Sequence, residues 1–272
     1  MGAALAHHQM LMAGGSGRVY DAWTVAWEAG IVAAGSSVTT TEKNWADDLA
    51  VNIRAASYAS KIKAFWPFIG VTAKAHMMPL IDTATKGIAS NNGFVDADCT
   101  NNGIANPTEA AKFISSLYDP SILGASGVGG MGWYERAIGF GTGTEPIGCY
   151  LSGDRWVLDL RSSLKAWRWS TVSTAAVSVA STAANKFYYG QSSATNSHEL
   201  FEDGTSIGTS TTANSGAANN VAIYLMASNE GPATYWKGRG GCALMTNGQF
   251  TGAEVSALKT LLDTYLITPT GR

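Results

Sequence analysis

Charged side chains are scarce in this sequence. Asp, Glu, Lys and Arg make up 14% of its 272 residues, against about 25% in an average soluble domain. Long exposed helices usually carry abundant Lys and Glu, so the composition disfavours an all-helical protein. With 18 basic and 20 acidic side chains the formal net charge is −2, which excludes the overall basic field typical of nucleic-acid-binding proteins.

Long apolar runs and cysteines are scarce as well. No stretch reaches roughly 18 apolar residues, so we expect no insertion into a membrane. The N-terminal stretch MGAALAHHQMLMAGGSG has no basic region ahead of an apolar core, which predicts cytoplasmic synthesis without a secretory signal. The three cysteines, Cys99, Cys149 and Cys242, are too few for a disulfide framework or a zinc site, and we expect reduced, buried thiols.

The N-terminal third has the periodicity of helices. Between Asp21 and Gly35 the apolar residues fall on one helix face, and Gly35 is a plausible stop; these residues are Trp23, Trp27, Ile31 and Ala34. Residues 35–43 are expected to form a linker. A second helical pattern begins near Asn44 and continues to Phe65, where Pro67 would end it.

The pattern changes after Pro67, where Gly, Asn, Thr and Ser clusters divide the chain into short pieces typical of antiparallel β-structure. Residues 155–161 alternate apolar and charged side chains and predict a half-buried strand, and residues 221–228 predict a central one. Asp203-Gly204 predicts a hairpin turn, and Asn247-Gly248 predicts a second. A capping box at Thr251 and Glu254 predicts one C-terminal amphipathic helix.

The sequence contains motifs that resemble catalytic or cofactor-binding sites, but the residues around them do not match such sites. The sequence of residues 127–132 fits G-x-G-x-x-G, but no helix pattern follows it, so we predict no nucleotide site. Of the carboxylates, Glu202 belongs to a turn flank and Asp96 and Asp98 to a solvated strand edge, so no glycosidase pair is evident. The histidines form no metal-binding pattern. We therefore expect a non-enzyme without a metal or cofactor.

Aromatic residues are the remaining candidates for a binding site, because exposed Trp and Tyr rings stack on sugars. Three clusters stand out: Tyr235 and Trp236 in a Gly/Pro-rich loop, Trp133 and Tyr134, and Trp167 and Trp169. Packing in the core, at its rim or at a subunit contact is the alternative for each pair.

Several short motifs together resemble a known family. They are Phe65-Trp-Pro-Phe-Ile-Gly70, then Lys74-Ala-His76, the hairpin at residues 199–204, and the pattern from Gly240 to Leu258. Over residues 45–267 the chain is similar to the concanavalin A/LamG-like jelly-roll domain of tailed-bacteriophage virion proteins. It departs from that family's lectins and glucanases in having neither a calcium-ligand cluster nor a glucanase triad.

The resemblance implies a mainly β protein, an antiparallel jelly-roll β-sandwich at residues 65–272 with an N-terminal helical anchor at residues 1–64. It implies a structural virion component (head decoration, fibre or tail) that contacts other virion proteins and forms a homo-oligomer, with a trimer expected for a fibre. Trp23, Trp27 and Ile31 would then belong to the assembly interface.

Two further hypotheses about the function stay open at this point. One is an adsorption module that binds host cell-surface polysaccharide through loop aromatics. The other is a polysaccharide-degrading glycosidase that would use Glu202 or Asp96.

Overall fold

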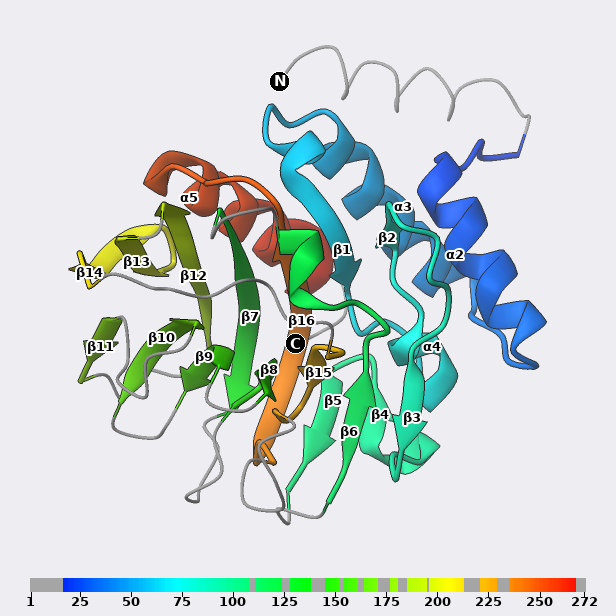
Figure 1. Ribbon diagram of the computed structural model, residues 1–272. Coiled ribbons are helices and arrows are strands. Elements are labelled where there is room, and N and C mark those ends of the chain that lie inside the picture. The colour runs from blue at the N-terminus through cyan, green and yellow to red at the C-terminus, as the bar shows by residue number, and fades with distance from the viewer. Residues whose placement is uncertain are drawn as a thin grey trace.

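The fold is a sandwich of two antiparallel β-sheets with a layer of helices on the outer side of one sheet (Figure 1). The computed structural model describes residues 17–107, 111–123, 128–137, 145–151, 154–160, 164–170, 177–180, 185–194, 196–212, 221–228 and 235–267. The mainly β jelly-roll sandwich expected from the sequence is confirmed.

The first sheet, sheet A, pairs its strands in the order β14-β13-β12-β7-β16-β1-β2, and β5 joins it beside β16 with β4 next to β5. The strand bounds are β14 Thr205–Ser210, β13 Ser197–Glu202, β12 Lys186–Ala194, β7 Gly129–Ala137, β16 Gly238–Thr246, β1 Ile62–Trp66, β2 Ile81–Asp82, β4 Cys99–Thr100 and β5 Gly103–Asn106. Residues 129–132 of the glycine motif lie within β7, which continues to Ala137, so a strand stands where a nucleotide-binding turn would lead into a helix.

The second sheet, sheet B, has the order β11-β10-β9-β8-β15-β6-β3. Its strands are β11 Val177–Val179, β10 Lys165–Ser170, β9 Asp154–Leu160, β8 Ile147–Leu151, β15 Tyr224–Leu225, β6 Phe113–Ser115 and β3 Ser90–Asn92. The strand predicted at residues 221–228 is central, since β15 pairs with β6 on one side and β8 on the other, although it is only two residues long.

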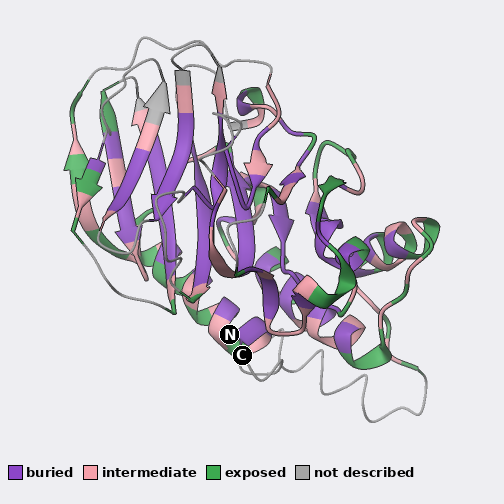
Figure 2. Cartoon of the chain, turned by 90° about the horizontal axis from the view of Figure 1, so that it is seen from below, coloured by how far each residue is buried: buried purple, intermediate pink, exposed green. Residues whose placement is uncertain are grey.

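Two hydrophobic cores follow from this layering. The inner core lies between the sheets, and the outer core lies between sheet A and the helices. Because side chains alternate along a strand, the longer strands β1, β7, β12, β13 and β16 of sheet A supply both. In β12, for example, Tyr188 belongs to the inner core and Phe187 and Tyr189 to the outer core. Figure 2 shows the strands as largely buried, with exposed residues concentrated on the helices and the outer edges.

A buried ion pair joins the two sheets across the inner core. Lys165 Nζ of β10 lies 2.9 Å from Glu135 Oε2 of β7, and both side chains are 0% exposed. The Lys165 ammonium also lies 5.0 Å from the centre of the Tyr188 ring. Burial raises the pKa of Glu135, and the nearby ammonium opposes that shift. The pair therefore ties β10 to β7 at a position where charge is costly unless it stays paired.

The helical layer consists of α2 (Ala22–Ala33), α3 (Thr40–Arg54) and α5 (Gly252–Leu262), and the short α4 (Ala73–Met77) follows β1. Short turns lie at η1 Ala59–Lys61, η2 Asp96–Asp98, η3 Pro120–Leu123 and η5 Asp263–Ile267. The first predicted helix is confirmed. It ends at Ala33, and Gly35, with φ at 77°, follows its C-cap residue Ala34. None of the helices in the described part of the chain has the length and apolar character needed to cross a bilayer.

The second helix differs from its prediction at both ends. It begins at Thr40, because Thr39 and Glu42 form a capping box inside the expected linker. It ends at Arg54, and Ile62–Trp66 is the strand β1, paired with β16 and β2. This strand crosses the domain boundary expected at residues 64 and 65. The N-terminal helices share the outer core with sheet A, so they pack on the sandwich itself.

Two of the three residues expected at an assembly interface lie inside the chain instead. Trp27 is 1% exposed and Ile31 is 0% exposed, both in the outer core. Trp23 is only partly buried, and the Arg54 guanidinium of α3 lies 3.9 Å from the centre of its ring. The expectation is corrected for Trp27 and Ile31, because these side chains of α2 pack into the outer core of their own chain.

The two expected hairpins have different outcomes. Asp203 and Gly204, with φ at 52° and 91°, connect β13 to β14 as predicted. The second prediction is wrong, because Asn247 and Gly248 lead from β16 to α5 without a returning strand. The capping box of α5, at Thr251 and Glu254, is confirmed. All three cysteines are free and buried, as expected.

Candidate functional site

Most of the aromatic residues proposed as sugar platforms are buried. Trp133, Trp167 and Trp236 are each 0% exposed in the inner core, and Tyr134 is 2% exposed in the outer core. The Trp236 ring packs edge-on against Trp133 with ring centres 5.1 Å apart. These four side chains have no face open to a ligand, which corrects the expectation. The side chain of Trp169 lies outside the described residues.

Tyr235 is the candidate that reaches the surface. It is partly exposed, and its backbone forms an isolated bridge with Ala227, just beyond β15. Neighbouring residues of extended chain point to opposite sides. Trp236 therefore enters the inner core while Tyr235 lies on the outer side of sheet B. The structure separates the two members of this predicted pair.

On that side Tyr235 belongs to a row of three aromatic rings, which we call the aromatic row: Phe113, Tyr224 and Tyr235. The ring centres of Phe113 and Tyr224 are 4.5 Å apart, with 14° between the ring planes. Those of Phe113 and Tyr235 are 6.3 Å apart, with 18° between the planes. All three residues are partly exposed. Near-parallel stacking fixes the rings against one another and leaves part of each accessible to a ligand.

Strand pairing places the row. Tyr224 of β15 pairs with Ser115 of β6, so Phe113 lies diagonally opposite Tyr224 on the same face. The alternate residues, Ile114 and Leu225, are 0% exposed in the inner core. Because Ile114 and Leu225 point into the inner core, their strand neighbours Phe113 and Tyr224 point to the outer side of sheet B.

Polar groups flank the row on the next strands. On the β8 side the residue opposite Tyr224 is Gly148, which adds no side chain there. Two residues further along β8, Tyr150 lies beneath the Arg155 guanidinium, whose carbon is 5.4 Å from the ring centre. Both residues are partly exposed. Arginine supplies several hydrogen-bond donors in a planar arrangement, which suits hydroxyl and carboxylate groups of a ligand.

The carboxylates considered for glycosidase chemistry lie elsewhere. Asp96 accepts a hydrogen bond from the Ala73 backbone N–H at 2.9 Å, at the start of α4. Glu202 ends β13 in sheet A, with one carboxylate oxygen 3.7 Å from Lys186 Nζ. Both therefore have structural partners away from the aromatic row. Within the described ranges, no group of three or more His, Cys, Asp or Glu side chains is placed to hold a metal ion.

Sequence reasoning missed Phe113 and Tyr224. Neither has an aromatic neighbour in the sequence, whereas the three predicted clusters are pairs of aromatic residues close together in the sequence. For Tyr224 a signal was present, because the alternation in residues 221–228 puts it opposite in direction to Ile223 and Leu225. For Phe113 the local sequence gives no comparable signal, since its partner is 111 positions away.

No protein-family model matches the chain, and no curated protein matches it either. Solved structures do match. A sialidase from Trypanosoma rangeli, in complex with 2,3-difluoro-KDN, has a TM-score of 0.51 and 11% identity over 76% of this chain and 33% of the sialidase. The HCR/D W1238A mutant has a TM-score of 0.52 and 9% identity over 74% of this chain and 52% of that one.

The chain thus spans about a third and about half of these two proteins. At such identities the likeness establishes the lectin-like β-sandwich fold, which many functions share.

Proposed function

We propose that the chain is a non-catalytic carbohydrate-binding module whose ligand stacks on the aromatic row of sheet B. The observation that carries the proposal is the row itself, Phe113, Tyr224 and Tyr235, partly exposed and held in near-parallel register. Sugar rings present apolar C–H faces that pack on aromatic rings, and their hydroxyl groups need nearby polar partners. Arg155 and Tyr150 stand on the adjacent strands to provide them.

The absence of catalysis is part of the proposal. Glycoside hydrolysis needs two carboxyl groups about 5–9.5 Å apart across the bond that is cleaved. The sequence candidates, Asp96 and Glu202, are engaged at α4 and at Lys186. Asp159 of β9 is 0% exposed and lies 3.4 Å from Arg168. A bound glycan would therefore be held and left intact.

A place on a bacteriophage particle, expected from the sequence resemblance, stays a prediction. A carbohydrate-binding sandwich is compatible with adsorption to a host surface, the second reading given above. It also accounts for the aromatic row, which an architectural role alone does not require.

The test is binding of the purified full chain to a panel of bacterial surface polysaccharides, with reducing ends measured in the same samples. We expect saturable binding without release of sugar. Tyr224→Ala and Phe113→Ala should each weaken binding about tenfold, equivalent to about 1.4 kcal/mol. Tyr20→Ala, which removes a partly exposed tyrosine beside α3, is the matched control and should bind normally.

Two results would overturn the proposal. Sustained release of reducing ends would make the protein an enzyme. Equal binding by the Tyr224→Ala, Phe113→Ala and Tyr20→Ala variants would move the ligand away from the row. Melting curves for each variant separate loss of binding from loss of folding.

A further inference from the structure

The solvent side of α2 is unusual for a surface helix. Six of its twelve residues are exposed, and every one is alanine or valine: Ala22, Val25, Ala26, Ala29, Val32 and Ala33. Val25 is 50% exposed and Val32 is 58% exposed. The opposite side is already used, with Trp27 and Ile31 in the outer core. A helix that is apolar all round is normally covered on all sides.

The charges near α2 do not reach this exposed side. Asp21, the N-cap, pairs with Arg54 at 2.8 Å, and Glu28 pairs with Lys43 at 2.5 Å. Both partners belong to α3, so these pairs lie toward the body of the protein. The exposed side therefore offers apolar contact without charge, and it suits an uncharged apolar occupant.

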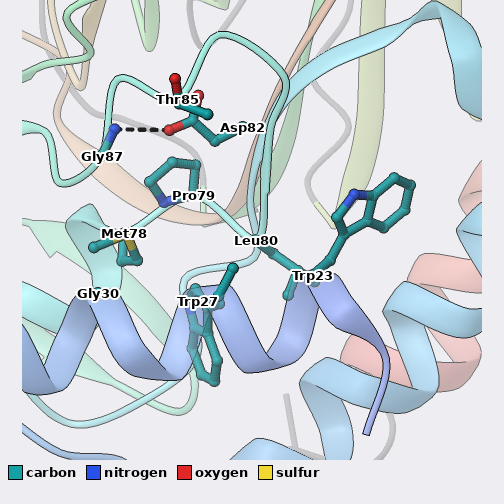
Figure 3. A pocket seen from close by; sticks show the side chains of 10 residues that line it. Trp23, Trp27, Gly30, Met78, Pro79, Leu80, Asp82, Thr85 and Gly87 are labelled. Carbon is teal, nitrogen blue, oxygen red and sulfur yellow. Dashed lines mark hydrogen bonds between the residues drawn. The ribbon is translucent and has the colours of Figure 1, made fainter.

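A cavity of about 230 Å³ continues this surface (Figure 3). Trp23, Ala26 and Gly30 of α2 form one wall, and the chain from Met78 to Leu80 forms the facing wall. Asp82 lies at the far side, where its carboxylate accepts a hydrogen bond from the Gly87 backbone N–H at 2.7 Å. The lining is mainly apolar and partly open, with room for a long unbranched side chain such as methionine.

We infer that this face of α2 and its cavity are covered by the chain's own residues 3–13, Ala-Ala-Leu-Ala-His-His-Gln-Met-Leu-Met-Ala. The segment holds no Asp, Glu, Lys or Arg, and it supplies Leu5, Met10, Leu11 and Met12. It is joined to α2, which begins at Ala22, through residues 14–21, and the first four of these are Gly-Gly-Ser-Gly, a sequence that permits sharp reversal of the backbone.

The lengths also agree. The twelve residues of α2 span about 18 Å, and eleven residues span about 16 Å even at the rise of a helix. Even as a helix the segment therefore reaches along nearly the whole apolar face, and in a more extended conformation it reaches along all of it. Its effective concentration at the face is high because the connection is short. This inference is independent of carbohydrate binding.

Thiol labelling in the full chain tests the inference. Val25→Cys and Val32→Cys place one thiol each on the face, and Val95→Cys, at a residue that is 56% exposed just before η2, is the matched control. The native cysteines are buried and do not compete. We expect a maleimide to label Cys at positions 25 and 32 at least tenfold more slowly than at position 95. Changing Met10, Leu11 and Met12 together to Gln should remove that protection.

Three results would overturn the inference. Labelling of the α2 positions as fast as position 95 in the otherwise unchanged chain would mean that nothing covers the face. Protection that persists in the triple Gln variant would assign the cover to something else. Protection that disappears on dilution, with a dimer seen by light scattering, would make a second copy the occupant. Circular dichroism of each variant confirms that it is folded.

Discussion

In both sheets every second side chain points to the outer face, but the outer face of sheet A is covered and that of sheet B is partly exposed. On sheet A the outward aromatics Phe187, Tyr189 and Phe201 are at most 2% exposed, because they lie in the outer core. There the Tyr189 ring stacks on Phe250, just ahead of α5. On sheet B the outward aromatics Phe113 and Tyr224 remain partly exposed. An outward aromatic residue on a strand is thus a core residue or a candidate binding residue according to what another part of the chain places over it.

The largest effect should come from the covered face. Trp27→Ala removes a buried indole from the outer core, and we expect a loss of about 3–5 kcal/mol in the free energy of unfolding, measured with urea. Phe113→Ala on the open face should cost clearly less, since that ring is partly solvated. Equal losses at the two positions would mean that the two faces are equally buried in solution.

The inter-sheet ion pair gives the next effect. Glu135→Gln leaves the Lys165 ammonium buried without its counter-charge, so we expect a loss of about 3 kcal/mol by urea unfolding. Adding Lys165→Met to that variant should recover most of the loss, because the remaining groups are then neutral. A double variant as unstable as the single one would show that the pair itself, rather than its imbalance, stabilises the sandwich.

Two glycines distinguish the rigid inner core from the adaptable edge of the helical layer. A Cβ on Gly190 would lie 2.4 Å from Trp167 Cε3, in a fully buried ring, so Gly190→Ala should cost about 1–3 kcal/mol. A Cβ on Gly30 would lie 2.2 Å from Met78 Cε, the end of a flexible side chain beside the cavity. Alanine is also the better helix former, so Gly30→Ala should change the stability by less than about 1 kcal/mol. Thermal melting compares the two.

The smallest effect is a pH dependence at the edge of sheet A. His198 is buried, its Nδ1 lies 2.6 Å from Ser192 Oγ, and burial lowers its pKa from 6.5. The unfolded chain therefore binds the proton more readily than the folded one. His198 should stabilise the fold fully above about pH 6.5 and progressively less as the pH falls through its lower folded pKa. Urea midpoints between pH 5 and 8 measure this, and the non-titrating variant His198→Asn should show a flatter slope.

Local rules predicted the elements whose cause is local. The capping box at Thr251 and Glu254 and the Asp203-Gly204 turn both depend on backbone groups within a few residues, and both are present. The capping box at Thr39 and Glu42 depends on equally local contacts, so the prediction of a linker over residues 35–43 was wrong for a stretch whose sequence already indicated a helix start.

The errors arose where distant partners decide. Residues 62–66 carry a short apolar run that fits a helix or a strand, and pairing with β16 and β2 makes it a strand. Asn247-Gly248 has the sequence of a hairpin turn, but no strand follows to pair with β16. The backbone N–H of Asn247 donates instead to the Lys61 carbonyl at 3.0 Å, an ordinary hydrogen-bond distance.

By itself the sequence determined the class of the fold, the capped helices, the reduced cysteines and the shortage of charge, since these depend on composition and on neighbours along the chain. Only the tertiary structure decided which aromatic residues are buried. Trp236 and Tyr235 are adjacent in the sequence, and one fills the inner core while the other joins the aromatic row. The physical reason is that burial depends on which sheet or helix faces a side chain, and those contacts connect residues more than a hundred positions apart.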